Sequence, residues 1–401
     1  MYSLHKQLLI DISELVNQDS KTGIQRVVRS ILKELLTNPP LGYKVEAVFG
    51  TPENEGYYYA KKFLSNFFTP QENQDSLSLN GQCTKTVEPP ISEEPIQFNK
   101  GDIFLGLDLQ HHVVLKQAPF YQKMREKKVK VYFIIYDLLP VLMPHVFHES
   151  VENLHHEWLS ILAQNDGVIC ISKAVADEFK IWLKKHKNEY YASCQVQWFH
   201  LGADVDASVP TLGIPDDGNS VIKILSSSPT FLMVGTVEPR KGQEQTLASF
   251  ELLWEQGLNI NLVIVGKQGW DVEVLIEKIT NHPELGKRLF WLNGISDEYL
   301  ETVYKVSTCL IAASEGEGFG LPLIEAAQHK LPIIARDIPV FKEVAGEYAY
   351  YFENDNNPEV FVDTVKKWLE LYEIDKHPKS DDMPWLTWEE STQALIKVLG
   401  T

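Results

Sequence analysis

The chain has 401 residues, of which 44% are hydrophobic and 23% are charged. This balance is ordinary for a globular protein, and the length exceeds that of one typical core, so two domains of about 200 residues each are expected. The formal net charge of −18 at pH 7 argues against a nucleic-acid partner, because phosphate contacts need clustered lysine and arginine.

Short apolar runs alternate with helix-period segments along the first half of the chain. The pattern predicts a strand at 8–12, a loop at 13–22, a helix at 23–36, and strands at 45–49, 103–106, 131–136 and 167–171. Residues 70–100 are rich in polar residues and proline, which is typical of a surface insertion. We expect this insertion to lie within a first domain that spans residues 1–206.

Proline, glycine, aspartate and serine collect at 207–230, which we expect to be a linker. Beyond it the pattern predicts a helix at 243–256 and strands at 231–235, 261–266, 289–292 and 308–312. Strands that alternate with helices imply parallel sheets. We therefore predict an α/β fold of two Rossmann-like domains that face each other across a cleft. The second domain spans 231–383, and a C-terminal helix at 384–401 is expected to return to the first domain.

Cysteine usage and apolar runs indicate the compartment. Cys83, Cys170, Cys194 and Cys309 show no paired spacing, so a reduced compartment is expected, with Cys170 and Cys309 as buried thiols. The first apolar run is too short for a signal peptide, and the longest, at 131–143, is broken by charge and proline. We therefore expect a cytoplasmic protein, with any membrane contact peripheral.

Two basic runs interrupt the overall acidity of the chain. Their residues are Lys123, Arg125, Lys127, Lys128 and Lys130 in the first run, and Lys180, Lys184, Lys185 and Lys187 in the second. Solvated helix faces are the ordinary interpretation of such runs. The sharper interpretation is a weak contact with an anionic membrane surface or with an acceptor that carries a pyrophosphate.

The segment from Ser314 to Ala327, SEGEGFGLPLIEAA, is the most informative part of the sequence. It follows a predicted strand and opens a helix, whose start offers free N–H groups and a positive dipole end to a pyrophosphate. Glu317 lies in the loop, where its carboxylate can accept hydrogen bonds from sugar hydroxyls. Glu325 lies eight positions further on, where it can reach a ribose diol. Taken alone, the segment is also compatible with a glycine-rich turn that carries two solvated glutamates.

This segment resembles the E-x7-E motif of glycosyltransferase family 4, which comprises retaining enzymes of the GT-B fold. Residues 231–242, FLMVGTVEPRKG, look like the donor-phosphate strand and turn of that family. There Arg240 and Lys241 would neutralise the phosphates and stabilise the departing nucleoside diphosphate. The TGIQR segment at 22–26 is similar to the family's glycine loop. The resemblance covers essentially the whole chain and is strongest at 231–352.

The resemblance implies two sets of site residues. The catalytic set is Glu317, Arg240, Lys241 and Asp137. The donor-binding set is Gly23, Gly235, Gly266, Gly318, Phe319, Gly320, Leu321 and Glu325.

The sequence departs from the family pattern at two places. Tyr136-Asp137 stands where many members have His-Asp, so a histidine-based role is in doubt, although Asp137 can still bind a sugar hydroxyl or orient the acceptor. Thr236 stands where an arginine usually follows the glycine, so Arg240 is expected to carry that charge.

The family resemblance implies transfer of a hexose from a nucleotide sugar to a hydroxyl of a saccharide or glycolipid acceptor in cell-surface polysaccharide biosynthesis. Segments 22–29 and 136–140 look like those of polysaccharide mannosyltransferases and favour GDP-mannose, while UDP-hexoses and dTDP-rhamnose remain open. A sugar-nucleotide epimerase of similar fold and a non-catalytic binding module also remain open. No cofactor or metal is expected, because the paired histidines at 111–112 and 155–156 lack metal-ligand spacing.

Overall fold

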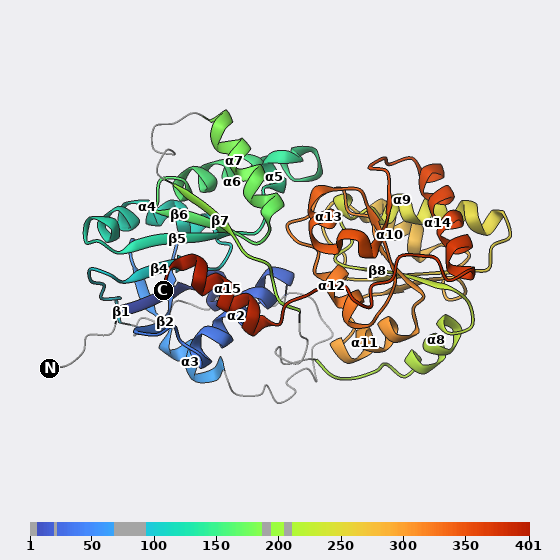
Figure 1. Cartoon of the computed structure of the whole chain (residues 1–401), viewed down its shortest axis with the longest axis horizontal. Coiled ribbons are helices and arrows are strands. Elements are labelled where there is room, and N and C mark those ends of the chain that lie inside the picture. The colour runs from blue at the N-terminus through green and yellow to red at the C-terminus, as the bar shows by residue number, and fades with distance from the viewer. Residues whose placement is uncertain (1–5, 20–21, 68–93, 187–193, 204–210) are drawn as a thin grey trace. The chain divides into compact units, whose positions relative to one another are not determined.

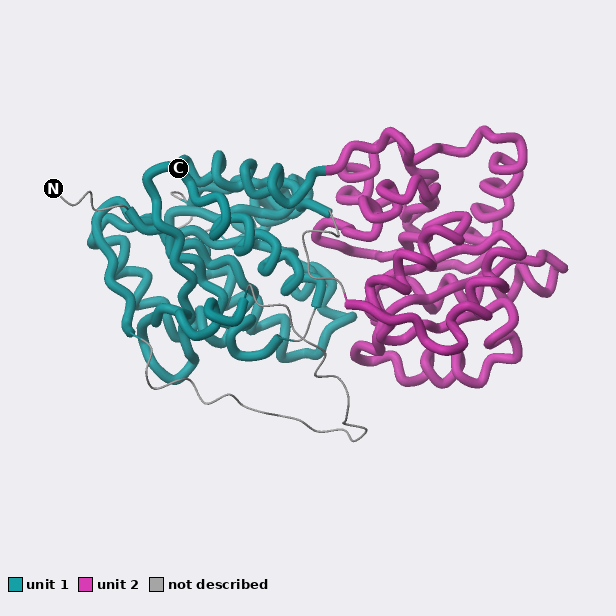
Figure 2. The backbone as a smooth tube through the Cα atoms, turned by 90° about the horizontal axis from the view of Figure 1, so that it is seen from below, with its two compact units in different colours: residues 1–209, 386–401 teal, residues 210–385 magenta. Residues whose placement is uncertain are grey.

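The computed structural model describes residues 6–19, 22–67, 94–186, 194–203 and 211–401. The chain divides into two compact units (Figure 2): unit 1 comprises 1–209 with 386–401, and unit 2 comprises 210–385. Most of the predicted insertion at 70–100 lies outside the described residues, as do Cys83 and Lys187. Among the described residues, no helix is both long and apolar enough to cross a membrane.

Unit 1 is built on a seven-stranded sheet in the order β3-β2-β1-β4-β5-β6-β7. Its strands are β1 (Lys6–Asp11), β2 (Tyr43–Gly50), β3 (Tyr57–Tyr59), β4 (Ile103–Gly106), β5 (Lys130–Ile135), β6 (Gly167–Cys170) and β7 (Gln195–Trp198). Its helices are α1 (Ser13–Asn17), α2 (Gly23–Thr37), α3 (Lys61–Phe67), α4 (His111–Glu126), α5 (Leu139–Leu142), α6 (Glu149–Leu162), α7 (Lys173–Lys185) and α15 (Trp388–Leu399), with a 3-10 turn η1 (Pro144–Val146). Figure 1 shows α4, α6 and α7 along one side of this sheet and α2 with α15 along the other.

The sheet of unit 1 departs from an all-parallel arrangement at β3, which pairs antiparallel with β2. One short connection joins these two strands, and it reverses the direction of the chain. A strand of three residues shows no usable periodicity, which is why the sequence did not predict it. The predicted loop at 13–22 is also wrong in part, because α1 occupies its first five residues.

Helix α2 begins where the pattern predicted. The Thr22 hydroxyl accepts from the backbone N–H of Gln25, and the Gln25 side chain accepts from the N–H of Thr22, which forms a capping box. The helix buries an apolar face that includes Val28, Ile31 and Leu35. The helix start at Gly23 is therefore fixed by its cap and by its packing.

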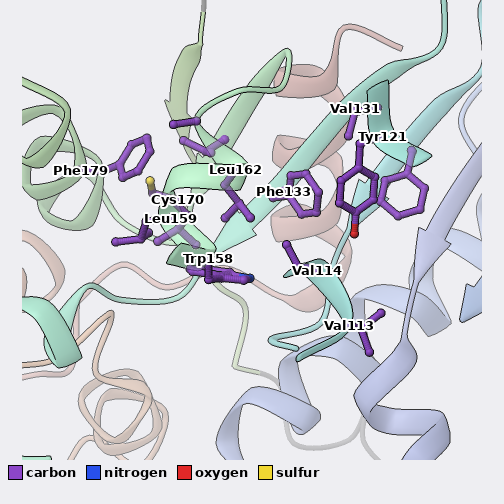
Figure 3. Packing of buried hydrophobic residues seen from close by; sticks show 14 of the residues in the cluster. Val113, Val114, Tyr121, Val131, Phe133, Trp158, Leu159, Leu162, Cys170 and Phe179 are labelled. Carbon is purple, nitrogen blue, oxygen red and sulfur yellow. The ribbon is translucent and has the colours of Figure 1, made fainter. Parts of the chain in front are cut away.

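The core of unit 1 is rich in aromatic side chains. Figure 3 shows Phe133 of β5, Tyr121 of α4 and Trp158 of α6, all of which are almost completely buried. The hydroxyl of Tyr121 lies 2.7 Å from that of Tyr57, which satisfies both polar ends inside the core. Strand β5 and helices α4 and α6 therefore share one buried core.

The C-terminal helix α15 packs on α2 within unit 1. The Ser391 hydroxyl donates to the carbonyl of His200 over 2.7 Å, and the backbone N–H of Ala203 donates to the carbonyl of Leu386 over 3.0 Å. The chain therefore completes unit 2 before it returns to unit 1.

Unit 2 contains a parallel six-stranded sheet in the order β10-β9-β8-β11-β12-β13. Its strands are β8 (Thr230–Val234), β9 (Asn261–Val265), β10 (Leu289–Leu292), β11 (Cys309–Ala312), β12 (Ile333–Arg336) and β13 (Ala349–Phe352). Its helices are α8 (Gly218–Leu225), α9 (Gln243–Glu255), α10 (Glu273–Thr280), α11 (Asp297–Val306), α12 (Leu321–Gln328), α13 (Pro339–Ala345) and α14 (Pro358–Glu373), with 3-10 turns η4 (Pro239–Lys241) and η5 (Gly346–Tyr348). Helix α8 lies inside the segment expected to be a linker and packs against α11.

Both sheets follow the Rossmann strand order, in which the chain runs outward from the middle in one direction and then in the other. The direction reverses between β1 and β4 in unit 1, and between β8 and β11 in unit 2. The loops after these neighbouring strands diverge at the reversal point and leave room for a ligand at the carboxyl edge. In unit 2 the turn with Arg240 and Lys241 follows β8, and the loop with Glu317 follows β11.

Candidate active site

Two loops meet at the carboxyl edge of the sheet in unit 2. The turn η4 follows β8, and the loop at 313–320 follows β11. The backbone N–H of Glu315 donates to the carbonyl of Arg240 over 2.8 Å. Gly242 has a φ of 74°, and a Cβ atom there would lie 2.5 Å from the carbonyl oxygen of Ala313. Only glycine allows this approach, so the two loops are held against each other.

Glu317, Arg240 and Lys241 form a compact charged cluster where the loops meet. Glu317 Oε1 accepts from Lys241 Nζ and, over 2.8 Å, from the hydroxyl of Ser314. Glu317 Oε2 lies 3.4 Å from Arg240 Nη1. Arg240 Nη2 also pairs with Glu238 Oε1 over 2.6 Å. The structure thus brings together three of the four predicted catalytic residues.

The surroundings of Glu317 keep its carboxyl ionised. Burial by itself would raise its pKa, but the positive charges of Lys241 and Arg240 and the hydrogen bonds from Lys241 and Ser314 outweigh burial and lower the pKa to about 2. The side chains of Lys241, Arg240 and Glu317 are only 14–15% exposed. Water therefore screens these charges weakly, and each cation is already opposite a carboxylate.

The start of α12 lies beside this cluster. Gly320 precedes the helix with a φ of 98°, and a Cβ atom there would lie 2.9 Å from a ring carbon of Phe341. A pocket next to the helix start is lined by Lys241, Glu317, Gly320 and Pro322, among others. The first turn of α12 therefore presents its N–H groups and positive dipole end close to Lys241, which suits a negatively charged ligand.

Within this loop, Gly318 and Phe319 are buried, and Leu321 is the first residue of α12. Glu325 lies one turn further into the helix, in a separate environment. It is 5% exposed, and its Oε2 accepts from the hydroxyl of Tyr304 over 2.8 Å. The ring of Tyr304 stacks on His329 at 4.9 Å, so the phenol that holds Glu325 is itself fixed.

The glycines at the ends of β8 and β9 are in close contact. Gly266 has a φ of 157°, and a Cβ atom there would lie 1.9 Å from the carbonyl oxygen of Gly235. The N–H of Gly235 donates to the carbonyl of Val265 over 2.9 Å. A side chain at Gly266 is therefore excluded by the turn after β8, which is a structural reason for glycine that the sequence did not reveal.

The two remaining predicted residues, Asp137 and Gly23, belong to unit 1. Asp137 follows β5, and its carboxylate accepts from the N–H of Leu139 over 3.0 Å at the start of α5. The Tyr136 hydroxyl is buried and donates to the carbonyl of Leu107 over 2.8 Å, so this side chain is part of the core. At Gly23 a Cβ atom would meet nothing within 4 Å.

Arg336, at the end of β12, is a residue near the site that the sequence did not single out. Its side chain is fully buried. Its Nε donates to the carbonyl of Ala313 over 2.9 Å, and its other nitrogens donate to Gln245 Oε1, to Asn354 Oδ1 over 3.3 Å and to the carbonyl of Asp355 over 3.0 Å. Ala313 begins the loop that carries Glu317, so the hydrogen bond from Arg336 anchors the start of that loop. The sequence feature that could have pointed to Arg336 is its position directly after the apolar run 331–335.

Two of the paired histidines bond to each other across α4 and α6. His111 Nε2 lies 2.8 Å from His155 Nδ1, and His155 Nε2 lies 3.3 Å from the carbonyl oxygen of Asp137. Burial lowers the pKa of His111 to about 3 and that of His155 to about 4, so both rings are neutral. Within the described ranges, no group of three or more His, Cys, Asp or Glu side chains is arranged to hold a metal ion.

The class of protein follows from the site, the fold and two comparisons. Residues 220–381, which contain the whole charged cluster and helix α12, match the family model described as "Glycosyl transferases group 1". Sucrose-phosphate synthase from Thermosynechococcus elongatus superimposes with a TM-score of 0.66 at 14% identity, covering 98% of each chain. Anabaena HepE in complex with UDP and glucose gives a TM-score of 0.62 at 12% identity, covering 99% of this chain and 100% of that one. The two Rossmann-like units therefore have the GT-B fold.

Particular relatives narrow this class. Two proteins named serotype-specific mannosyltransferase WbdA, both from Escherichia coli, are 45% identical over 397 residues and 46% identical over 402 residues. These matches cover 98% and 99% of this chain but only 46% and 47% of the relatives. The chain thus has the GT-B fold, contains a segment that matches the group 1 glycosyltransferase model and resembles mannosyltransferases, and it spans somewhat less than half the length of these relatives.

Proposed function

We propose that the chain is a mannosyltransferase that uses GDP-mannose to extend a saccharide or glycolipid acceptor in cell-surface polysaccharide synthesis. One observation carries this proposal. Arg240, Lys241 and the start of α12 converge at the strand-reversal point of the domain that matches group 1 glycosyltransferases. Convergent cations and a helix start suit the diphosphate of a nucleotide sugar. The mannosyltransferase names of the relatives support the choice of sugar, and their serotype specificity supports a surface polysaccharide.

The proposed roles follow from the positions of the side chains. Lys241 and Arg240 hold the diphosphate and stabilise the charge that develops on it as the bond to the sugar breaks. Glu317 positions the sugar through its hydroxyls. Glu325, already oriented by Tyr304, binds the ribose. The backbone at Gly235 and Gly266 lies against the donor.

The acceptor is proposed to bind to unit 1 near Asp137, and the backbone at Gly23 is proposed to approach the donor phosphate or the acceptor. As expected for the retaining family that the sequence resembles, the departing phosphate takes the proton of the acceptor hydroxyl on the same face of the sugar. This route needs no side-chain nucleophile, and we propose that it needs no divalent ion, since Arg240, Lys241 and the start of α12 supply the positive charge.

A transfer assay with the purified chain tests this function. GDP-mannose, UDP-glucose and dTDP-rhamnose are each incubated with and without a short mannose oligosaccharide, and with and without EDTA, and the products are analysed by mass spectrometry. We expect one added hexose only with GDP-mannose plus acceptor, and no effect of EDTA. Conversion of the sugar without an acceptor would indicate an epimerase, and restoration of EDTA-treated enzyme by Mg²⁺ or Mn²⁺ would show a metal requirement.

We further propose weak peripheral attachment to the inner face of the cytoplasmic membrane through the two basic runs of unit 1. Attachment should be weak because part of this charge is neutralised locally: Lys123 pairs with Glu55, and Lys180 pairs with Asp177. Binding to anionic vesicles should fall between ~50 and ~500 mM salt, as the Debye length shrinks from roughly 14 to 4 Å. Equal recovery with neutral and anionic vesicles would contradict this attachment.

A further inference from the structure

The cations proposed to bind the diphosphate are already engaged by carboxylates of the chain. Lys241 contacts Glu317, and Arg240 lies between Glu317 and Glu238. The four formal charges of Glu238, Arg240, Lys241 and Glu317 sum to zero. A diphosphate therefore does not enter a site of net positive charge. It has to compete with Glu317 for Lys241 and, in part, for Arg240.

We infer that Glu317 is a specificity-determining residue that makes the site favour the intact nucleotide sugar over the nucleoside diphosphate product. The inference rests on the proposed function. When phosphate oxygens take Lys241 and Arg240, the Glu317 carboxylate loses charged partners in a buried position. It keeps the hydrogen bond from the hydroxyl of Ser314, 2.8 Å away.

A carboxylate in such a place is costly unless new hydrogen-bond donors reach it. The hydroxyls of a transferred hexose are suitable donors, and they arrive with the intact nucleotide sugar. The nucleoside diphosphate has no hexose and brings only negative oxygens towards Glu317. The competition between carboxylate and phosphate therefore penalises the product more than the donor, which favours product release after transfer.

Glu315 provides a matched control for this effect. It lies two residues before Glu317 in the same loop and carries the same charge. Its backbone N–H donates to the carbonyl of Arg240, but its carboxylate is in none of the ion pairs of the cluster described above. Glu315→Gln therefore changes the net charge of the loop by the same amount as Glu317→Gln and leaves the competition for Lys241 in place.

The experiment measures the affinity of the full chain for GDP and for GDP-mannose by calorimetry. In the wild type we expect GDP-mannose to bind more tightly than GDP. Glu317→Gln should bind GDP about tenfold more tightly than the wild type, because GDP no longer has to break a charge-assisted hydrogen bond between Glu317 and Lys241. The variant should also lose the preference for GDP-mannose over GDP. Glu315→Gln should change both affinities by the same factor, below about threefold. If the transfer assay identifies another nucleotide, its diphosphate and sugar nucleotide replace this pair.

Three outcomes would overturn the inference. The first is that Glu317→Gln binds GDP no more tightly than the wild type does. The second is that Glu315→Gln gains as much affinity for GDP as Glu317→Gln does. The third is that the wild-type chain binds GDP as tightly as GDP-mannose. The last needs no variant, so it remains decisive even if the substitution prevents folding. Failure of the proposed function looks different: a chain without a donor site would bind no nucleotide or nucleotide sugar, and an epimerase would convert the nucleotide sugar without an acceptor.

Discussion

Replacement of Arg336 by methionine should destabilise unit 2 by about 3 kcal/mol, although the new side chain is apolar and of similar length. Arg336 is fully buried and lies over the ring of Phe352, 5.1 Å from its centroid. Its nitrogens donate to neutral carbonyl and amide oxygens, and burial lowers its pKa. Methionine removes the cost of burying the charge, but it also removes every one of these hydrogen bonds.

The size of the loss depends on which acceptors find new partners. Asn354 and Asp355 are exposed, and the Asp355 carbonyl also accepts from Gln245 Nε2 over 2.7 Å, so these groups stay hydrogen-bonded. The Ala313 carbonyl and Gln245 Oε1 lie inside the unit. Two buried acceptors left unsatisfied cost about 1–3 kcal/mol each, and relief of the buried charge offsets part of that cost.

Thermal unfolding of the full chain measures the effect. For a unit of this size, about 3 kcal/mol corresponds to a drop of about 6–12 °C in the Tm of unit 2. Arg288→Met is the matched control: Arg288 also lies over an aromatic ring, that of Trp254, but it is 28% exposed and pairs with Glu284. Its replacement should cost less than about 1 kcal/mol. If both variants lower the Tm equally, the anchoring role of Arg336 is refuted.

Three further predictions address chemistry and pH. Lys241→Ala should lower kcat by roughly 10²–10³, because it loses a charge-assisted bond to the leaving phosphate, and a kcat within twofold of wild type would contradict that role. Tyr304→Phe should raise the KM for the donor about fivefold with kcat nearly unchanged, since it removes the hydrogen bond to Glu325 without altering the reacting centre. A fall in kcat as large as the rise in KM would argue against a ribose contact. Burial raises the pKa of Asp108 to about 7, so the folded chain keeps a proton that the unfolded chain releases near pH 4. The free energy of unfolding of unit 1 should therefore fall by up to about 4 kcal/mol between about pH 4 and 7, and Asp108→Asn should flatten this dependence in pH-dependent melts.

The fold was predictable where the hydrophobic pattern was long and regular. Strands β4 and β10 have the bounds that the sequence predicted, and α2 and α9 start where expected. The parallel order followed from the alternation of strands and helices. Short elements without a full period, such as β3, α1 and α8, were not predictable in this way, because their stability comes from neighbours distant in sequence.

The sequence predicted that Glu317, Arg240 and Lys241 lie after strands of the second domain, but it did not predict their contacts. The glycine-rich segment and the Arg240-Lys241 pair were identified from their positions after strands. That Glu317 would be held by Lys241, 76 residues earlier, depends on β8 and β11 being neighbours in the sheet, and no local pattern carries that information. The same holds for Tyr304 and Arg336, which act on the site from other elements.

The contrast between the two sheets bears on where an anionic ligand binds. The strand order is the same around both reversal points, yet the charges placed there differ. In unit 1 Asp11 is the last residue of β1 and Asp108 follows β4, and burial raises the pKa of Asp11 to about 6 and that of Asp108 to about 7. Both carboxyls are buried, so neither offers a positive charge to a diphosphate, and any ionised fraction would repel it. In unit 2 the same position holds Arg240 and Lys241, whose charges are balanced by the carboxylates of Glu238 and Glu317. The same strand order with different charges therefore supports the proposal that the nucleotide diphosphate binds to unit 2 and that unit 1 recognises the acceptor through its hydroxyls.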